Sequence, residues 1–336
     1  MNNLSFGIDL GTSNIRIYNC ADDSVTMEKN IIAIENKKTV FAYGDSAFEM
    51  YEKAPGNIVI THPLANGVIA DIKNMETIVK FFMNSIMGNN IRPADYYIAV
   101  PTDVTEVEKR AFYDLIKECN IKARKIMVIE KAIADGLGID INVKTSQGTL
   151  IVDVGYDTTE ISILSLGGIV LSRLIKTGGL KFDESIKNAV RKEYGLFIGS
   201  KTAEVVKTSL KELDEAGEDA VVYGRDIVTG LPVERRISTS IIYDTLEEHF
   251  SHIIDNIKLI LESTPPELSA DIYKNGLFLT GGGSMVNTFA SKIADGTGLK
   301  VNITDQPQLS VIKGIAKVIK DENFRSVAYS IEGMGK

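Results

Sequence analysis

Phe6-Gly7-Ile8-Asp9-Leu10-Gly11-Thr12-Ser13-Asn14 joins an apolar run to a short polar turn. Ile15 and Ile17 resume the apolar run, which is the pattern of a tight β-hairpin. A glycine in the turn lets backbone N–H groups approach an anion, and short polar side chains add further contacts. The predicted phosphate-binding turn consists of Gly11, Thr12, Ser13 and Asn14. An ordinary N-terminal hairpin is the alternative.

The segment Thr149–Leu164 repeats this pattern, with an apolar strand, an aspartate, a polar turn and a second apolar strand. Asp9 and Asp153 take matching places before the two turns, where a carboxylate can hold a hydrated Mg²⁺ against phosphates. The second turn contributes the candidate nucleotide contacts Gly155, Tyr156, Asp157, Thr158 and Thr159. Two such hairpins predict a duplicated architecture that grips a phosphate chain between its halves.

A third phosphate-binding element lies near the C-terminus. The strand Gly276–Leu279 runs into three glycines, Gly281, Gly282 and Gly283, and then into a predicted helix start. Such a turn allows a nucleotide to approach the backbone closely. A lone glycine run would be weak, but three elements in this order point strongly to a nucleotide site.

The composition limits the possible classes of protein. A chain of 336 residues suits two lobes, and 44% hydrophobic with 24% charged residues is ordinary for a globular protein. The net charge of −8 argues against nucleic acid as a partner. Cys20 and Cys119 imply neither a disulfide framework nor a metal site, so we expect a cytoplasmic protein. His249 and His252 share a helix face, which we interpret as solvated rather than metal-binding.

At this point the chain resembles the actin, heat-shock-70 and sugar-kinase superfamily, and within it the MreB family of bacterial actin homologues. The similarity is collinear over nearly the whole chain. Its motifs are GIDLGTSN at 7–14, PGNI at 55–58, GVIAD at 67–71, VPTDVTEVEKRAF at 100–112, TTE at 158–160, GG-FDE around 178–184, TAEVVK at 202–207, PPELSADI at 265–272 and LTGGG at 279–283.

The resemblance implies an α/β actin-like fold with two lobes, each built on a duplicated ribonuclease-H-like mixed sheet flanked by helices. It divides the chain into four subdomains. The first large one comprises 1–28, 71–140 and 310–336, and a small one comprises 29–70. The second large one comprises 141–182 and 239–309, and its small one 183–238. The helix after strand 125–129 would connect the lobes, with Gly136 and Gly138 allowing close packing.

The resemblance also implies ATP or ADP with Mg²⁺ as cofactors, and Thr158 as a catalytic residue beside the phosphates. Glu204 and Lys207 lie at i and i+3 on a predicted helix and therefore share a face. In the family this pair faces the adenosine, so we expect both residues to contact ribose or base. A surface ion pair is the alternative.

The chain departs from the family at the residue that positions the attacking water. MreB-like proteins usually begin the connecting helix with Glu-Pro, and here the matching residues are Lys131 and Ala132, 27 positions before Thr158. Glu130 is one residue away, which is about 100° around a helix. An ammonium cannot accept a proton from water. Groups that do accept this proton are worth roughly 10²–10⁴ in rate. We therefore expect slow hydrolysis.

A second departure concerns the turn Gly155–Thr159, where Tyr156 and Asp157 replace two family glycines. A carboxylate about 6 Å from a phosphate oxygen costs about 3 kcal/mol at an effective dielectric constant of about 20. We hypothesise that Lys131 partly neutralises Asp157.

The resemblance implies that the main partner is the chain itself, in a filament of paired protofilaments. A helix at 105–119, with a capping box from Thr105 to Glu108, would lie near the contact between them, although a solvated helix is the alternative. Ile86 and Met87, before Gly88-Asn89-Asn90, could insert into a membrane or could complete a helix's core face. Membrane-anchored shape or motility proteins are further possible partners at the inner face of the cell membrane.

Three functions share these hairpins. The first, which we favour, is a nucleotide-gated cytoskeletal filament for cell shape, or for shape or motility in a wall-less bacterium. The second is a small-molecule kinase, but its base position would be Lys131 and no substrate motif is apparent. The third is a chaperone ATPase domain, which would be followed by a peptide-binding domain that we do not find before Lys336.

Overall fold

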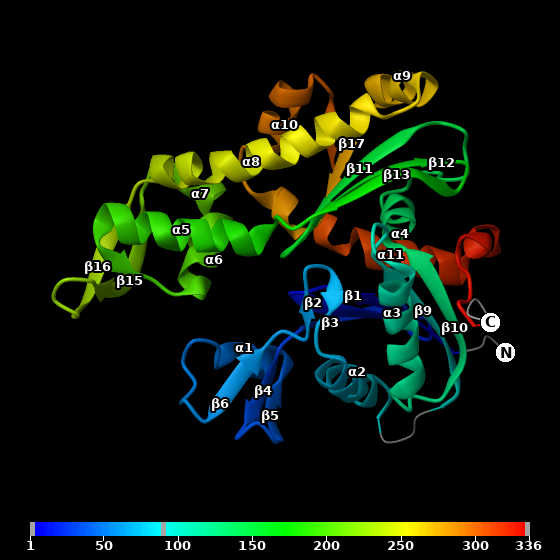
Figure 1. The fold of residues 1–336 in the computed structure, drawn as a ribbon, viewed down its shortest axis with the longest axis horizontal. Helices are drawn as coiled ribbons and strands as arrows, with labels where there is room; N and C mark the ends of the chain where they lie inside the picture. The colour runs from blue at the N-terminus through cyan, green and yellow to red at the C-terminus, as the bar shows by residue number, and fades with distance from the viewer. Residues whose placement is uncertain (1–3, 89–91, 333–336) are drawn as a thin grey trace.

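The computed structural model describes residues 4–88 and 92–332, and Figure 1 shows them as two lobes that meet near the middle of the molecule. The first lobe contains a five-stranded sheet in the order β10-β9-β1-β2-β3. Its strands are β1 (Ser5–Leu10), β2 (Asn14–Asn19), β3 (Ser24–Lys29), β9 (Ala94–Val100) and β10 (Ala123–Glu130).

The second lobe contains a sheet of the same design, in the order β13-β12-β11-β17-β18. Its strands are β11 (Thr149–Val154), β12 (Thr159–Ser165), β13 (Gly168–Ile175), β17 (Leu277–Thr280) and β18 (Val301–Ile303). In both sheets the first strand pairs antiparallel with its hairpin partner and parallel with a later strand. The predicted duplication is therefore confirmed at the level of strand order and direction.

Smaller sheets extend from each lobe and lie on the same side of the molecule in Figure 1. One comprises β4 (Ile32–Glu35), β5 (Thr39–Tyr43) and β6 (Ile58–Thr61), beside α1 (Gly44–Glu49), with β7 (Leu64–Ala65) and β8 (Val68–Ile69) following. The other comprises β14 (Leu196–Phe197), β15 (Ala220–Asp226) and β16 (Pro232–Ile237), near α6 (Ser200–Thr208) and α7 (Leu210–Ala216). The four subdomain boundaries drawn from the sequence stay a prediction.

Helices cover the large sheets because each has one apolar face to bury. They are α2 (Ile72–Met87) and α3 (Glu106–Glu118) in the first lobe, and α5 (Gly179–Tyr194), α8 (Thr239–Glu262), α9 (Pro266–Asn275) and α10 (Phe289–Thr297) in the second. The predicted capping box is present at α3, where the Glu108 N–H donates to Thr105 Oγ1 over 3.2 Å and the Thr105 N–H donates to Glu108 Oε2 over 2.8 Å.

Two helices, α4 (Lys131–Gly138) and α11 (Ser310–Lys320), cross between the two large sheets. Glycine makes this crossing possible. A Cβ on Gly138 would lie 1.7 Å from the Ser310 carbonyl oxygen, and one on Gly314 would lie 1.6 Å from the Ala134 carbonyl oxygen. The predicted connecting helix and the role of Gly138 in its packing are confirmed, and α11 supplies the matching glycine.

Ile86 and Met87 end α2, and both are partly buried against the core of the first lobe. This packing agrees with the alternative that they complete the helix's core face, and membrane insertion stays a prediction. Asn89 and Asn90 lie outside the described residues. Among the described helices, none combines the length and apolar character that crossing a bilayer requires.

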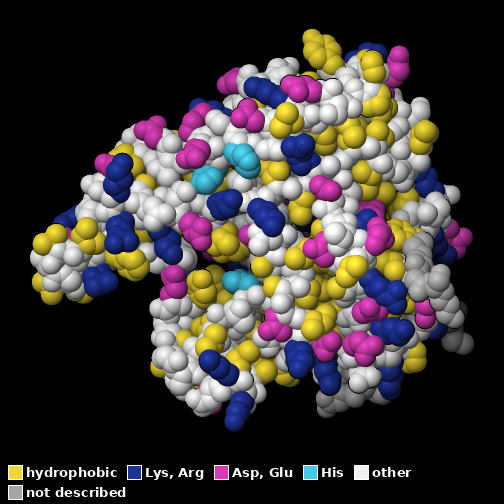
Figure 2. Space-filling view, in the orientation of Figure 1, with side chains coloured by type: hydrophobic (Ala, Val, Ile, Leu, Met, Phe, Trp, Pro, Cys, Tyr) yellow, Lys and Arg dark blue, Asp and Glu magenta, His cyan; other side chains and the backbone are white. Residues whose placement is uncertain are grey.

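Charged side chains of both signs are interspersed over the face shown in Figure 2.

The two histidines of α8 do not lie on a purely solvated face, because each bonds a hydroxyl group. His249 Nε2 lies 2.7 Å from Ser185 Oγ, and His252 Nδ1 lies 3.2 Å from Thr177 Oγ1.

Candidate functional site

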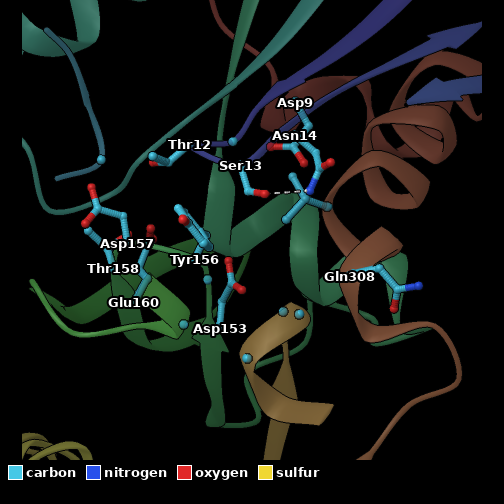
Figure 3. Close-up of a pocket in the computed structure, with 18 of the residues that line it drawn as sticks. Asp9, Thr12, Ser13, Asn14, Asp153, Tyr156, Asp157, Thr158, Glu160 and Gln308 are labelled. Atoms are coloured by element: carbon cyan, nitrogen blue, oxygen red, sulfur yellow. Dashed lines mark hydrogen bonds between the residues drawn. The ribbon is translucent and has the colours of Figure 1, made fainter. Parts of the chain in front are cut away.

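A cavity between the lobes collects nearly every residue that the sequence analysis selected. Figure 3 shows side chains of the two hairpins facing it from opposite sides. The predicted residues among its lining are Asp9, Gly11, Thr12, Ser13, Asn14, Lys131, Asp153, Gly155, Tyr156, Asp157, Thr158, Glu204, Lys207, Gly281, Gly282 and Gly283. Thr159 is the exception: it is fully buried, and its hydroxyl donates to the Thr177 carbonyl over 2.7 Å.

The first turn is closed by a hydrogen bond from the Gly11 N–H to the Asn14 carbonyl, 3.0 Å long. A Cβ on Gly11 would lie 2.8 Å from that same carbonyl oxygen, so the turn requires glycine. The buried Asn30 supports the turn from behind: its amide Nδ2 donates to the Gly11 carbonyl and its backbone N–H to the Ser13 carbonyl, each over 2.9 Å. The turn is therefore fixed before any ligand arrives.

The second turn is closed in the same way. The Gly155 N–H donates to the Thr158 carbonyl over 2.8 Å, and a Cβ on Gly155 would lie 2.9 Å from that oxygen. Beyond the turn, the N–H of Gly179 donates to the Gly155 carbonyl over 3.1 Å and ties the start of α5 to the hairpin. The two lobes thus present the same turn geometry to one cavity.

The glycine turn after β17 completes the wall of the cavity. Gly281 has φ +80°, and a Cβ there would lie 2.2 Å from Asp153 Oδ1, so no other residue fits. The predicted helix start is the 3-10 helix η1 (Gly282–Met285). Gln308, in the 3-10 helix η2 (Pro307–Leu309), also lines the cavity and was not predicted, because nothing in its local sequence marks it.

Lys131, the first residue of α4, pairs with Asp153 and not with Asp157. Its Nζ lies 2.7 Å from Asp153 Oδ2, whereas Asp157 accepts a hydrogen bond from the backbone N–H of Asn66, in the turn between β7 and β8. The hypothesis that Lys131 neutralises Asp157 is therefore wrong. Asp157 instead links the second hairpin to the small sheet of the first lobe.

Burial alone would favour the neutral amine of Lys131, but the carboxylates of Asp153, Asp9 and Glu160 raise its pKa above the ordinary lysine value. Lys131 is thus a fixed cation. Burial raises the pKa of Glu160 to about 7, with Lys131 acting in the opposite direction. Beneath these groups, the Thr280 hydroxyl donates to Asp135 Oδ2 over 2.5 Å, and burial raises the pKa of that carboxyl.

Asp9 is also paired, with a residue that the sequence analysis missed. Arg16 Nη1 lies 3.0 Å from Asp9 Oδ2, and Arg16 lines the cavity. The signal was available, because a turn at Gly11–Asn14 places Asp9 and Arg16 directly opposite each other in the hairpin. Both predicted Mg²⁺ ligands are therefore engaged by cations, and this arrangement opposes direct coordination of a divalent ion by their Oδ2 atoms. Contact with a hydrated Mg²⁺ through water stays a prediction.

On the far side of the cavity, α6 presents Glu204 and Lys207. The two do not form the surface ion pair considered as the alternative. Lys207 is buried, its Nζ lies 2.7 Å from Asp183 Oδ1, and it donates to the Gly179 carbonyl over 3.2 Å. Burial raises the pKa of Asp183 to about 6, and Lys207 partly offsets that shift.

The profile of the MreB/Mbl protein family matches residues 3–326 of this chain. Cell shape-determining protein MreB of Escherichia coli K12 is 34% identical over 322 residues, which cover 93% of this chain and 92% of that protein. Cell shape-determining protein Mbl of Bacillus subtilis 168 is 36% identical over 313 residues, which cover 92% and 93% respectively.

A solved structure of MreB 5 of Spiroplasma citri bound to AMPPNP matches this fold with a TM-score of 0.89 and 34% sequence identity, over 97% of this chain and 98% of that one. The fold is therefore the actin-like fold predicted from the sequence. The chain belongs to the MreB/Mbl protein family.

Proposed function

We propose that this protein is an ATP-binding cytoskeletal protein that assembles into filaments in the cytoplasm and serves cell shape. The observation that carries the proposal is the pair of matching turns, closed by the Gly11–Asn14 and Gly155–Thr158 hydrogen bonds, that face one cavity from the two lobes. A phosphate chain between them would hold the lobes together, and lobe closure changes the surfaces available for assembly.

The similar proteins support the same assignment. Two curated relatives are described as cell shape-determining proteins, and solved structures of MreB 5 from Spiroplasma citri hold AMPPNP and ADP. The expected site residues follow the cavity: the two turns and Gly281–Gly283 would contact the phosphates, and α6 the adenosine, through Glu204 in particular because Lys207 is held by Asp183. The ion pairs of Asp9 with Arg16 and of Asp153 with Lys131 oppose the expectation that these carboxylates bind Mg²⁺ directly.

We also propose that hydrolysis is slow. Lys131 stands at the start of α4, and its ammonium, held by Asp153, can neither accept a proton from water nor orient water as an acceptor. Thr158 lines the cavity and stays a candidate for contact with the terminal phosphate. Slow ATP hydrolysis predicts long-lived polymers, or a partner protein that promotes their disassembly.

The test is assembly of the purified protein with ATP, ADP, AMPPNP or no nucleotide, measured by sedimentation and negative-stain microscopy. We expect filaments with ATP and AMPPNP and a soluble protein without nucleotide. Nucleotide binding without filaments under any of these conditions would contradict the cytoskeletal assignment and favour a small-molecule kinase of the same fold. Failure to bind nucleotide would contradict the site itself.

A further inference from the structure

The duplicated hairpins differ in the charge of the residue opposite the matched aspartate, Asp9 in one and Asp153 in the other. In the first, Asp9 lies opposite Arg16, and in the second, Asp153 lies opposite Glu160. The second hairpin therefore lacks a cation of its own, and Lys131 of α4 supplies one from outside, with its Nζ 2.7 Å from Asp153. Each of the two aspartates thus has one cationic partner.

These ion pairs lie in sheltered positions. The side chains of Asp9 and Asp153 are 6% and 9% exposed, and those of Arg16 and Lys131 are 13% and 24% exposed. Withdrawing one carboxylate from such a pair leaves a buried charge without a partner, which is strongly destabilising. A metal ion that took Asp9 Oδ2 or Asp153 Oδ2 as a ligand would have to displace Arg16 or Lys131 first.

Arg16 and Lys131 also balance the charges of Asp9 and Asp153 without a divalent ion. Asp9 and Asp153 are neutralised by one divalent ion, and Arg16 and Lys131 neutralise them as well. Glu160, which also lies beside Lys131, adds the same charge in both cases. A divalent ion added to the paired site would bring two further positive charges close to an ammonium and a guanidinium. Both cations line the cavity, where their remaining donors can face phosphate oxygens.

We propose that this chain binds nucleoside triphosphate with little dependence on Mg²⁺, because Arg16 and Lys131 provide the positive charge that a divalent ion would bring to Asp9 and Asp153. The inference rests on the proposed nucleotide site and adds which cations serve it. Lys131 then has two effects. It occupies the position of the group that would activate water, and its ammonium is a counter-ion for Asp153.

The test is the dissociation constant of AMPPNP, measured by calorimetry in Mg²⁺ and in excess EDTA. For the unmodified chain we expect a change of less than threefold on chelation. For Lys131→Ala, which frees Asp153, we expect chelation to weaken binding at least tenfold. Lys131→Arg retains a cation, so chelation should again change the dissociation constant by less than threefold. This variant distinguishes loss of the positive charge from loss of the folded structure.

Lys109→Ala is the matched control. Lys109 and Glu130 form an ion pair of 2.8 Å, close to the 2.7 Å of Lys131 and Asp153, with similarly sheltered side chains, but neither lines the cavity. For Lys109→Ala, the ratio of the AMPPNP dissociation constants in EDTA and in Mg²⁺ should equal that of the unmodified chain. A tenfold or greater loss on chelation in the unmodified chain would overturn the inference while leaving the nucleotide site standing, and equal ratios for Lys131→Ala and the unmodified chain would remove Lys131 from it. Absence of binding in both buffers would refute the nucleotide site and the inference together.

Discussion

The side chain at position 131 sets the chemistry available at the start of α4. Replacing Lys131 with glutamate would put an acceptor where water must be oriented, and such groups are worth roughly 10²–10⁴ in rate. We expect Lys131→Glu to raise single-turnover phosphate release by roughly 10²-fold. Lys131→Gln is the control for loss of the ammonium alone, and equal rates for the two variants would contradict the assigned role of position 131.

Asp183 gives a second prediction at this scale, for the dependence of stability on pH. Its pKa of about 6 in the folded protein lies above the ordinary aspartate value near 4, so the folded state binds its proton more tightly. The stability it contributes is complete below about pH 4 and is lost as pH rises through 6. Relative to Asp183→Asn, the unmodified chain should lose roughly 2–3 kcal/mol of unfolding free energy between pH 4 and pH 7. Denaturant titrations at both pH values measure this, and a constant difference would contradict it.

The sequence predicted the two turns well, because a glycine in a short polar turn between apolar strands is a local signal, and both turns are closed as expected. Their contact with phosphate stays a prediction. It did not predict the partners of the charges. Lys131 was assigned to Asp157, but α4 delivers its ammonium to Asp153, while Asp157 reaches the Asn66 backbone. Such pairings depend on how two lobes are placed in space, and no spacing along the chain encodes that. Arg16 was predictable from hairpin register alone.

At the scale of elements, the crossing of α4 and α11 depends on two glycines. A Cβ on Gly314 would lie 1.6 Å from the Ala134 carbonyl oxygen, which belongs to rigid helix backbone. We expect Gly314→Ala to cost about 3 kcal/mol of unfolding free energy, at the upper end for overpacking. Gly56→Ala is the control, because a Cβ there meets nothing within 4 Å. Equal unfolding free energies would show that the helices can separate without cost.

Another element-scale feature joins the small sheets across the cavity. Glu52 accepts hydrogen bonds from the Ser200 N–H over 2.7 Å and the Ser200 hydroxyl over 2.8 Å, at the start of α6. A carboxylate at a helix N-terminus is stabilising by about 0.3–1 kcal/mol. Because α6 carries Glu204 and Lys207, which line the cavity, we expect this contact to influence the proposed nucleotide site.

We therefore expect Glu52→Gln to speed dissociation of a fluorescent ATP analogue by about two- to fivefold, corresponding to about 0.5–1 kcal/mol. Stopped-flow displacement measures this rate. Glu35→Gln, in β4 of the same lobe, is the control for loss of one negative charge and should leave the rate unchanged, because the partner of Glu35 is Asn57 and not a residue of α6. Identical dissociation from both variants would contradict the coupling.

At the scale of the whole molecule, two sheets of one design enclose a cavity, and α4 and α11 pack against each other between them. The sequence predicted two matching halves because the hairpins repeat, and the resemblance to the MreB family implied the helix that connects them. Which surfaces would meet in a filament is not encoded in any local pattern, because the exposed faces are defined only once the lobes are in place.

The most direct measurement follows polymer mass and released phosphate in the same sample after ATP is added. We expect the protein to sediment soon after mixing while phosphate accumulates much more slowly, and Lys131→Glu to release phosphate nearly in step with assembly. A chain that stays in the supernatant with ATP, or that releases phosphate as fast as Lys131→Glu, would contradict a slowly hydrolysing, nucleotide-gated filament.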